Sequence, residues 1–247
     1  MKYELTNESM INADGKKLFR IKALVDIEEY GVKAGDLGGW IEKEDNLSQS
    51  GNAWIFGEAK VYDDAQVSSD AMVSDDANIS GAAKVYGNAG VYGNTEVYGD
   101  AMVSGDANVS GAAKVYGNAE VSGDACVSGS AKVYGDTKVS GSAWVYGDAE
   151  VSGDAEVSGS AKVSGSAKVS GDADYAVIKG FGTEYRPTTF FRCRDGEARV
   201  ICGCFYGTIA EFREQVKQTR NGKVADEYLK IADLMEYHFK EDSGING

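Results

Sequence analysis

Aliphatic residues recur at every sixth position from Ile55 to Val169 without interruption. All twenty of these positions hold Val, except positions 55 and 79, which hold Ile. A small residue stands two positions before each of them, and it is Ala everywhere except at Thr95 and Thr137. A period this short predicts a solenoid, in which each repeat buries its apolar side only against its neighbours.

Each six-residue unit contains its own inside and outside pattern. In the segment Ala-x-Val-Ser/Tyr, strand alternation places Ala and Val on one face and the other two side chains on the opposite face. The pair that follows combines Gly with Asp, Asn or Ser, which are the residues that favour tight turns. Each unit is therefore expected to form a very short strand followed by a corner.

This pattern resembles the hexapeptide-repeat superfamily, in which an aliphatic residue and a small residue recur within every six positions. The resemblance covers residues 47–174, roughly half of the chain. It implies a mainly β protein built on a left-handed parallel β-helix, with three units or about 18 residues per coil and about seven coils here. It implies no particular activity, because function depends on sites added to a fold.

The residues before the repeat, 1–46, follow a different pattern and are expected to form a β cap. An open solenoid end exposes an apolar core and unpaired strand edges, which a capping segment must cover. Residues 16–24 are expected to form a strand, and the stretch 31–41 is a turn-rich approach to the first coil. Trp40, Trp54 and Phe56 are suitable side chains to close this end of the core.

Residues 175–247 are expected to form a small α+β domain, a hairpin followed by two helices. The hairpin spans 188–206, with Asp195-Gly196 as a type I′ turn between apolar runs. Thr208 and Glu211 have the spacing of a capping box, which predicts a helix start. A second helix is expected at about 224–240. Apolar residues at helical spacing are Ile209, Phe212 and Val216 in the first helix, and Tyr228, Ile231, Leu234, Met235 and Phe239 in the second.

The three parts together resemble hexapeptide-repeat proteins carried by phages and prophages. The stretches GDLGGWI at 35–41 and CGCFYGT at 202–208 carry this second resemblance. It implies a phage-related origin and no mechanism.

The net charge of −14 arises mainly from the repeat, where residues 47–174 hold 18 acidic and 7 basic residues. An acidic surface disfavours nucleic acid and anionic membranes, because both are bound through basic residues. Acidic corner residues that keep the rod soluble explain this charge, and mimicry of nucleic acid on a partner's basic groove is the alternative. The start of the chain has no apolar signal-peptide core, and four cysteines form no disulfide framework, so a cytoplasmic location is expected.

Enzymatic chemistry is not expected, and neither is a cofactor. Hexapeptide-repeat acyltransferases use a His as general base, and the carbonic anhydrases of that superfamily bind zinc with three His. The one His of this chain, His238, lies outside the repeat. The tail contains one alternative, since Cys193, Cys202, Cys204 and His238 have the composition of a zinc site. Buried structural cysteines and a helix-end His explain the same residues without a metal.

Three units per coil bring outward side chains into columns that run along the rod. One column contains three successive tyrosines beside a corner rich in acidic residues, which predicts a stacked ladder that stabilises the sheet or serves as a docking strip. The residues of this tyrosine and acidic ladder are Tyr62, Tyr98, Tyr116, Tyr134, Asp100 and Asp136.

A second outward face contains most of the other large apolar side chains. Exposed aromatics in such number need covering by a second chain, by the C-terminal domain or by a foreign partner. This face is therefore the preferred interface, formed by Trp54, Phe56, Met72, Tyr92, Trp144 and Tyr146.

The leading hypothesis is a non-enzymatic binding protein that acts through protein–protein contacts, with a host protein as partner and a dimer or trimer as its own state. It could inhibit a host enzyme or defence component. Two alternatives stay open: a metal- or small-ligand-binding protein or enzyme centred on the C-terminal domain, and a structural phage spacer.

Overall fold

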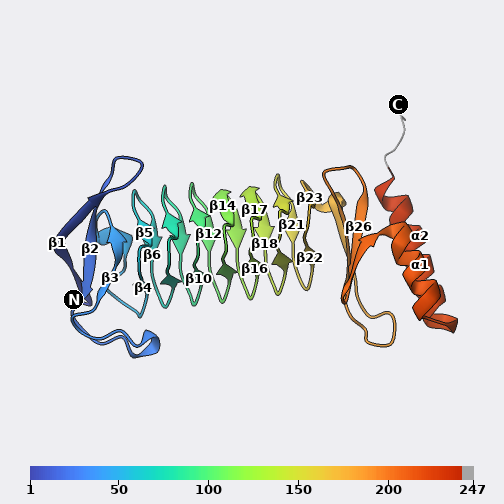
Figure 1. Ribbon diagram of the computed structural model, residues 1–247, viewed down its shortest axis with the longest axis horizontal. Helices are drawn as coiled ribbons and strands as arrows, with labels where there is room; N and C mark the ends of the chain where they lie inside the picture. Colours follow the sequence, from blue (N-terminus) through green and yellow to red (C-terminus); the bar gives the residue numbers. More distant parts are fainter. Residues whose placement is uncertain (241–247) are drawn as a thin grey trace.

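The computed structural model describes residues 1–240 and shows a straight rod of stacked coils with a different structure at each end (Figure 1). Each coil contributes one short strand to each of three parallel sheets, and strand partners lie three repeat units apart in the sequence, as in the pairs Val115↔Val133 and Val127↔Val145. The prediction of a parallel β-solenoid with three units per coil and about seven coils is confirmed.

The first sheet has ten strands, and its outward side over the solenoid is called the tyrosine face. Its order is β1 (Tyr3–Ile11), β2 (Lys17–Ala23), β3 (Leu37–Ile41), β5 (Lys60–Val61), β8 (Asn78–Ile79), β11 (Glu96–Val97), β14 (Lys114–Gly117), β17 (Lys132–Gly135), β20 (Glu150–Val151) and β23 (Lys168–Val169).

The outward side of the second sheet is called the tryptophan face, and that of the third sheet the third face. The second sheet contains β4 (Trp54–Ile55), β7 (Met72–Val73), β10 (Gly90–Val91), β13 (Asn108–Val109), β16 (Cys126–Val127), β19 (Trp144–Val145) and β22 (Lys162–Val163). The third contains β6 (Gln66–Val67), β9 (Lys84–Val85), β12 (Met102–Val103), β15 (Glu120–Val121), β18 (Lys138–Val139) and β21 (Glu156–Val157).

The core of the rod consists of the Ala and Val of every unit, all fully buried. Thr95 and Thr137 replace Ala inside this core, and each hydroxyl donates to a backbone oxygen three residues earlier, at Tyr92 (2.6 Å) and Tyr134 (2.7 Å). A buried hydroxyl needs such a partner to offset its lost hydration.

Glycine occupies most corners, where consecutive coils approach closely in a left-handed backbone conformation, although Asp63, Ser69 and Asp75 adopt the same conformation in an early coil. Gly87 has φ +74°, and a Cβ at this position would lie 2.8 Å from the backbone nitrogen of Gly105 in the next coil. Gly159 occupies the same corner near the end of the rod with φ +66°, yet no atom lies within 4 Å of its Cβ position. The corner sequence thus matches both the turn and the stacking of the coils.

The N-terminal segment extends the first sheet and covers the first coil. Strands β1 and β2 pair antiparallel, β2 pairs antiparallel with β3, and β3 pairs parallel with β5 of the solenoid. Short 3-10 turns lie at η1 (Glu28–Tyr30) and η2 (Glu44–Asn46). The ring of Tyr3 packs edge-on against that of Trp54, with centroids 6.4 Å apart. The structure therefore agrees with a cap at this end of the rod.

The C-terminal segment covers the other end. After η3 (Asp172–Asp174) comes a fourth, antiparallel sheet of β24 (Tyr175–Ile178), β25 (Thr188–Arg192), β26 (Ala198–Cys202) and β27 (Phe205–Thr208), then α1 (Ile209–Thr219) and α2 (Gly222–Phe239). Phe191, Cys193 and Ile201 join the apolar core of the solenoid. The opposite side of this sheet packs on the helices through Phe190, Val200 and Phe212.

The hairpin between β25 and β26 differs from its predicted turn. The amide of Gly196 donates to the oxygen of Cys193 (2.9 Å), and the amide of Cys193 donates to the oxygen of Glu197 (2.9 Å). Only Gly196 has positive φ, at +84°, whereas a type I′ turn requires positive φ at both central residues. The connection is therefore a three-residue loop with Gly in the left-handed position, and the type I′ prediction is wrong.

Two further sequence expectations need correction in this region. The domain contains four strands rather than one hairpin, because β24 and β27 flank the predicted pair. Leu234 is 57% exposed, since the buried face of α2 is set by Tyr228, Ile231 and Met235, and Leu234 lies away from it. The capping box is confirmed: the hydroxyl of Thr208 accepts from the amide of Glu211 (3.1 Å), whose carboxylate accepts from the amide of Thr208 (2.7 Å).

Candidate binding surface

Three tyrosine rings form a continuous stack on the tyrosine face. The centroids of Tyr98 and Tyr116 lie 4.9 Å apart and those of Tyr116 and Tyr134 lie 4.8 Å apart, with interplanar angles of 4° in both pairs. This spacing follows from the backbone, because strands of neighbouring coils are separated by the ordinary strand distance of about 4.8 Å. The predicted ladder is confirmed for these three residues.

Tyr62 belongs to the same column but is separated from the stack by Ser80 and lies beneath the N-terminal segment. Its ring packs in a small cluster with Leu18 and Trp40, and its side chain is 8% exposed. Its hydroxyl donates to the carboxylate of Asp14 (2.8 Å). Burial, aided by this carboxylate, raises the pKa of Tyr62 to about 12. Tyr62 is thus part of the cap and not of the exposed strip.

The far end of the stack is tied to the C-terminal domain. The hydroxyl of Tyr134 donates to one carboxylate oxygen of Glu150, and this bond, together with burial, raises the pKa of Tyr134. The other oxygen of Glu150 forms an ion pair with Arg194 in the β25–β26 loop (3.4 Å). Burial also raises the pKa of Tyr98 and Tyr116, so all three ladder hydroxyls stay protonated at neutral pH.

The predicted acidic residues beside the ladder lie on the corner of the rod. Asp100 and Asp136 are both exposed. The side chain of Asn118, between them in the column, donates to Asp136 (2.8 Å), which orders this part of the corner. Aromatic edges and carboxylates therefore run side by side along the rod.

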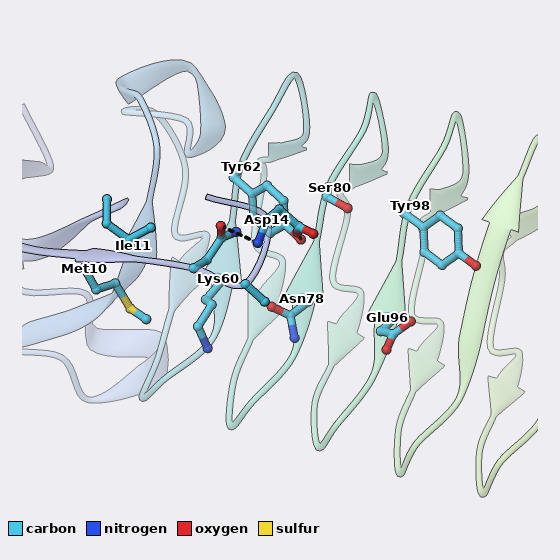
Figure 2. Close-up of a pocket in the computed structure, with 11 residues that line it drawn as sticks. Met10, Ile11, Asp14, Lys60, Tyr62, Asn78, Ser80, Glu96 and Tyr98 are labelled. Carbon is cyan, nitrogen blue, oxygen red and sulfur yellow. Dashed lines mark hydrogen bonds between the residues drawn. The ribbon is translucent and has the colours of Figure 1, made fainter. Parts of the chain in front are cut away.

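A groove opens at the near end of the stack, where the tip of the β1–β2 hairpin overhangs the tyrosine face (Figure 2). It has a volume of about 450 Å³. Its roof is formed by residues 10–14, and its floor by Lys60, Tyr62, Asn78, Ser80, Glu96 and Tyr98. The tyrosine face is thus a strip with a hollow at one end and an Arg–Glu pair at the other.

The sequence contained only part of this site. Ladder residues followed from the column, but the overhang of residues 10–14 depends on how the hairpin continues the sheet, which no local pattern specifies. Glu96 and Glu150 occupy equivalent positions three coils apart, a signal that the repeat itself contains. This equivalence identifies Glu96 and Glu150 as the two carboxylates that can accept a hydrogen bond from the tyrosine face.

The tryptophan face differs from its prediction at the N-terminal end. Trp54 is 1% exposed beneath Tyr3, and Phe56 is half-buried against the ring of Tyr30, with centroids 6.1 Å apart. The predicted exposure of Trp54 is therefore wrong, because the chain's own first residues provide the cover that this face needed. Met72, Tyr92 and Tyr146 are half-buried, and Trp144 is 49% exposed with the ammonium of Lys162 over its ring (5.5 Å).

The predicted zinc ligands are not brought together. Cys193 is buried in the solenoid core, and burial raises the pKa of its thiol. Cys202 accepts a hydrogen bond from Thr188 (3.2 Å), Cys204 is exposed, and His238 contacts the backbone oxygen of Ala173 (3.1 Å). Within residues 1–240, no group of three or more His, Cys, Asp or Glu side chains has an arrangement suited to a metal ion. Cys193 and Cys202 pack in the apolar clusters on the two sides of the sheet.

Comparison with protein-family models gave no match to the chain, and comparison with curated protein sequences gave none either. Neither α1 nor α2, the two helices of residues 1–240, combines the length and apolar character needed to cross a membrane.

Proposed function

We propose that this protein is a non-enzymatic binding protein whose tyrosine face docks a protein partner. The observation that supports this proposal is the parallel stack of Tyr98, Tyr116 and Tyr134 on a rigid sheet. Aromatic side chains held in one conformation provide contact area at little cost in conformational entropy, which favours their use at interfaces.

The charge of the surface favours a protein over a nucleic acid as the partner. The chain has a net charge of −14, and Asp100 and Asp136 are exposed beside the ladder. A nucleic-acid strand stacked on these rings would bring its phosphates close to those carboxylates. A partner with basic residues flanking an apolar segment is complementary to the strip.

A non-enzymatic role agrees with the structural use of the repeat residues. Gly residues at the corners adopt the positive φ of the turn, and Ala and Val fill the core of the coil. The hydroxyl of Tyr134 in the ladder is bonded to Glu150. These residues thus have structural explanations that need no reaction.

The superfamily and the phage-related origin of this chain are proposed from sequence resemblance. The repeat resembles the hexapeptide-repeat superfamily, which favours a left-handed coil, and the flanking segments resemble phage and prophage proteins. A phage-encoded rod of this kind would act in the host cytoplasm by inhibiting a host enzyme or defence component. A structural spacer in a phage particle is the runner-up proposal.

The test replaces the three ladder tyrosines by Ser, the residue that occupies other positions of the same column. A variant with Tyr98→Ser, Tyr116→Ser and Tyr134→Ser keeps the coil, since Ser80, Ser152 and Ser170 occupy the same positions. Its matched control is Tyr86→Ser, an exposed tyrosine (38%) on the third face. Immobilised wild-type and control proteins should each capture a defined prey protein from a lysate of the cells in which this protein is produced. The immobilised triple variant should not capture it. Equal capture by all three forms would contradict the proposal.

The exposed Trp144 favours self-association as a second role for the tryptophan face. Its 49% exposure leaves a large apolar surface uncovered in one copy of the chain. Trp144→Glu combined with Tyr146→Glu should shift sedimentation equilibrium from a dimer or trimer to a monomer while the β-sheet spectrum stays unchanged. A wild-type protein that is monomeric at all concentrations would exclude this role.

A further inference from the structure

The groove beside Tyr98 corresponds to a ladder position that lacks its ring. Ser80 and Tyr134 occupy the same column three coils apart, because β8, β11, β14 and β17 pair in steps of one coil. Tyr98 stacks on Tyr116 with one face, at 4.9 Å. Toward Ser80, the next position of its column, there is no ring to stack on, and Tyr98 lines the open groove (Figure 2).

Glu150, the carboxylate that accepts from the hydroxyl of Tyr134, also has a counterpart beside the groove. The hydroxyl of Tyr134 donates to Oε1 of Glu150, while Oε2 of Glu150 pairs with Arg194 (3.4 Å). Glu96 has the same position relative to Ser80 as Glu150 has relative to Tyr134. Oε2 of Glu96 pairs with Lys114 (2.7 Å). Among the contacts of residues 1–240, Oε1 of Glu96 has no partner. The groove thus holds an anchored carboxylate with one acceptor atom free.

The other walls complete a socket for a flat ring. Met10 and Ile11 provide apolar contacts from the roof, and Tyr62 closes the side opposite Tyr98. One oxygen of Asp14, which also lines the groove, already accepts a hydrogen bond from the hydroxyl of Tyr62. Asp14 and Glu96 place two carboxylates at the groove and Lys60 places one ammonium there. The free acceptor of Glu96 favours an occupant with a hydroxyl donor.

We propose that this groove binds a tyrosine side chain of the protein partner. The incoming ring takes the place in the column above Ser80 and stacks on Tyr98. Its hydroxyl donates to Oε1 of Glu96, as that of Tyr134 donates to Glu150. The proposal rests on the proposed function, because the partner that supplies the ring is the one docked on the tyrosine face.

The experiment titrates the full chain with N-acetyl-L-tyrosinamide and, separately, with N-acetyl-L-phenylalaninamide, using ligand-observed NMR. The tyrosine probe is expected to bind about tenfold more tightly, the fold-change that one hydrogen bond to a charged group produces. Equal binding of the two probes, or no saturable binding of either, would overturn the socket.

Two pairs of variants locate the binding. Ser80→Tyr supplies the missing ring from the chain itself and should abolish binding, whereas Ser122→Tyr makes the same change on the third face and should leave it unchanged. Glu96→Gln should weaken binding about tenfold, whereas Lys114→Gln breaks the same ion pair but keeps the carboxylate and should retain binding. Binding as tight as that of the wild type in either variant would overturn the proposal, and Glu96→Gln provides the test if Ser80→Tyr folds poorly.

Failure of the socket and failure of the proposed function give different results. If the socket is wrong, the tyrosine probe fails to bind while the triple ladder variant still loses its prey. If the proposed function is wrong, the prey is captured equally by all forms. The last arm uses p-cresol: binding of p-cresol without binding of the blocked tyrosine would show a small-phenol site and overturn the assignment to a protein side chain.

Discussion

The rings of Tyr116 and Tyr134 lie parallel, with centroids 4.8 Å apart and an interplanar angle of 4°, although a full coil of sequence separates them in the chain. Their backbones are hydrogen-bonded strands of neighbouring coils, so the strand spacing of the sheet matches the spacing of the rings. Tyr116 has a second neighbour in Tyr98, whereas each outer ring has one. The ladder is therefore a stabilising element as well as a surface.

Removal of the central ring should cost more stability than removal of an outer one. Tyr116→Ser loses two stacked pairs and should lower the free energy of unfolding by about 1 to 3 kcal/mol, and Tyr98→Ser by about half as much. Guanidinium unfolding monitored by circular dichroism measures both. Tyr86→Ser is the control, because Tyr86 makes no ring contact within residues 1–240. An effect of Tyr116→Ser no larger than that of Tyr86→Ser would show that the stack contributes nothing.

Two glycines of one corner should respond differently to the same substitution. Gly159→Ala should cost about 1 kcal/mol through the left-handed backbone alone, because its Cβ position is open. Gly87→Ala adds a contact of 2.8 Å to the backbone of Gly105 and should cost at least twice as much. Thermal unfolding of the two variants provides the comparison. Equal losses would mean that the coils can separate locally at no cost.

The capping box of α1 should be worth a measurable part of the C-terminal domain's stability. Thr208→Ala removes the acceptor for the amide of Glu211 and should lower the stability by about 1 kcal/mol. Thr219→Ala, at the other end of the helix, removes only a bond from its hydroxyl to the backbone oxygen of Gln215 and serves as the control. Hydrogen exchange of the first-turn amides should quicken in the first variant and stay slow in the second.

Lys2 should make the stability rise with pH in the alkaline range. Its side chain is 5% exposed, with the ammonium donating to the backbone oxygen of Ala53 (2.7 Å). Burial lowers its pKa from 10.5 to about 8, a shift partly offset by Asp70. Between these values the unfolded chain binds more protons than the folded one, so raising the pH favours folding.

The effect of Lys2 is isolated by comparison with Lys2→Met. The difference in unfolding free energy, wild type minus variant, should increase from pH 7 to pH 9.5 by on the order of 1 kcal/mol. The subtraction cancels the titration of tyrosines and cysteines, which are common to both proteins. Urea unfolding at the two pH values measures it. A difference that falls or stays constant with pH would show that Lys2 remains charged and hydrated in the folded chain.

Much of the architecture was predictable because the six-residue period leaves few alternatives. The period specifies the coil, the register of one coil on the next and hence the columns, so the stack of Tyr98, Tyr116 and Tyr134 followed from sequence positions alone. The capping box at Thr208 was equally readable, since its contacts span three residues. Interactions between sequence neighbours, or between copies of one repeat, are visible in the sequence.

Predictions were wrong for residues whose neighbours belong to a segment outside the six-residue repeat. Trp54 occupies an outward position of its coil, yet Tyr3 and the rest of the N-terminal segment cover it. Leu234 has helical spacing with the buried residues of α2, yet it is 57% exposed. The cysteines and His238 share a composition suited to zinc but lie in different packing environments.

The sequence by itself determined the rod: where each coil turns, which side chains form its core and which stand in line outside. That is possible because one repeat packs on a copy of itself, so the local pattern and the tertiary contact are the same information. Only the tertiary structure decided how the two end segments lie against the rod. The hairpin tip at residues 10–14 overhangs the tyrosine face and shapes the groove at Ser80, and Arg194 reaches Glu150 from the other end. These placements depend on unique contacts between unlike segments, for which no repeat supplies the pattern.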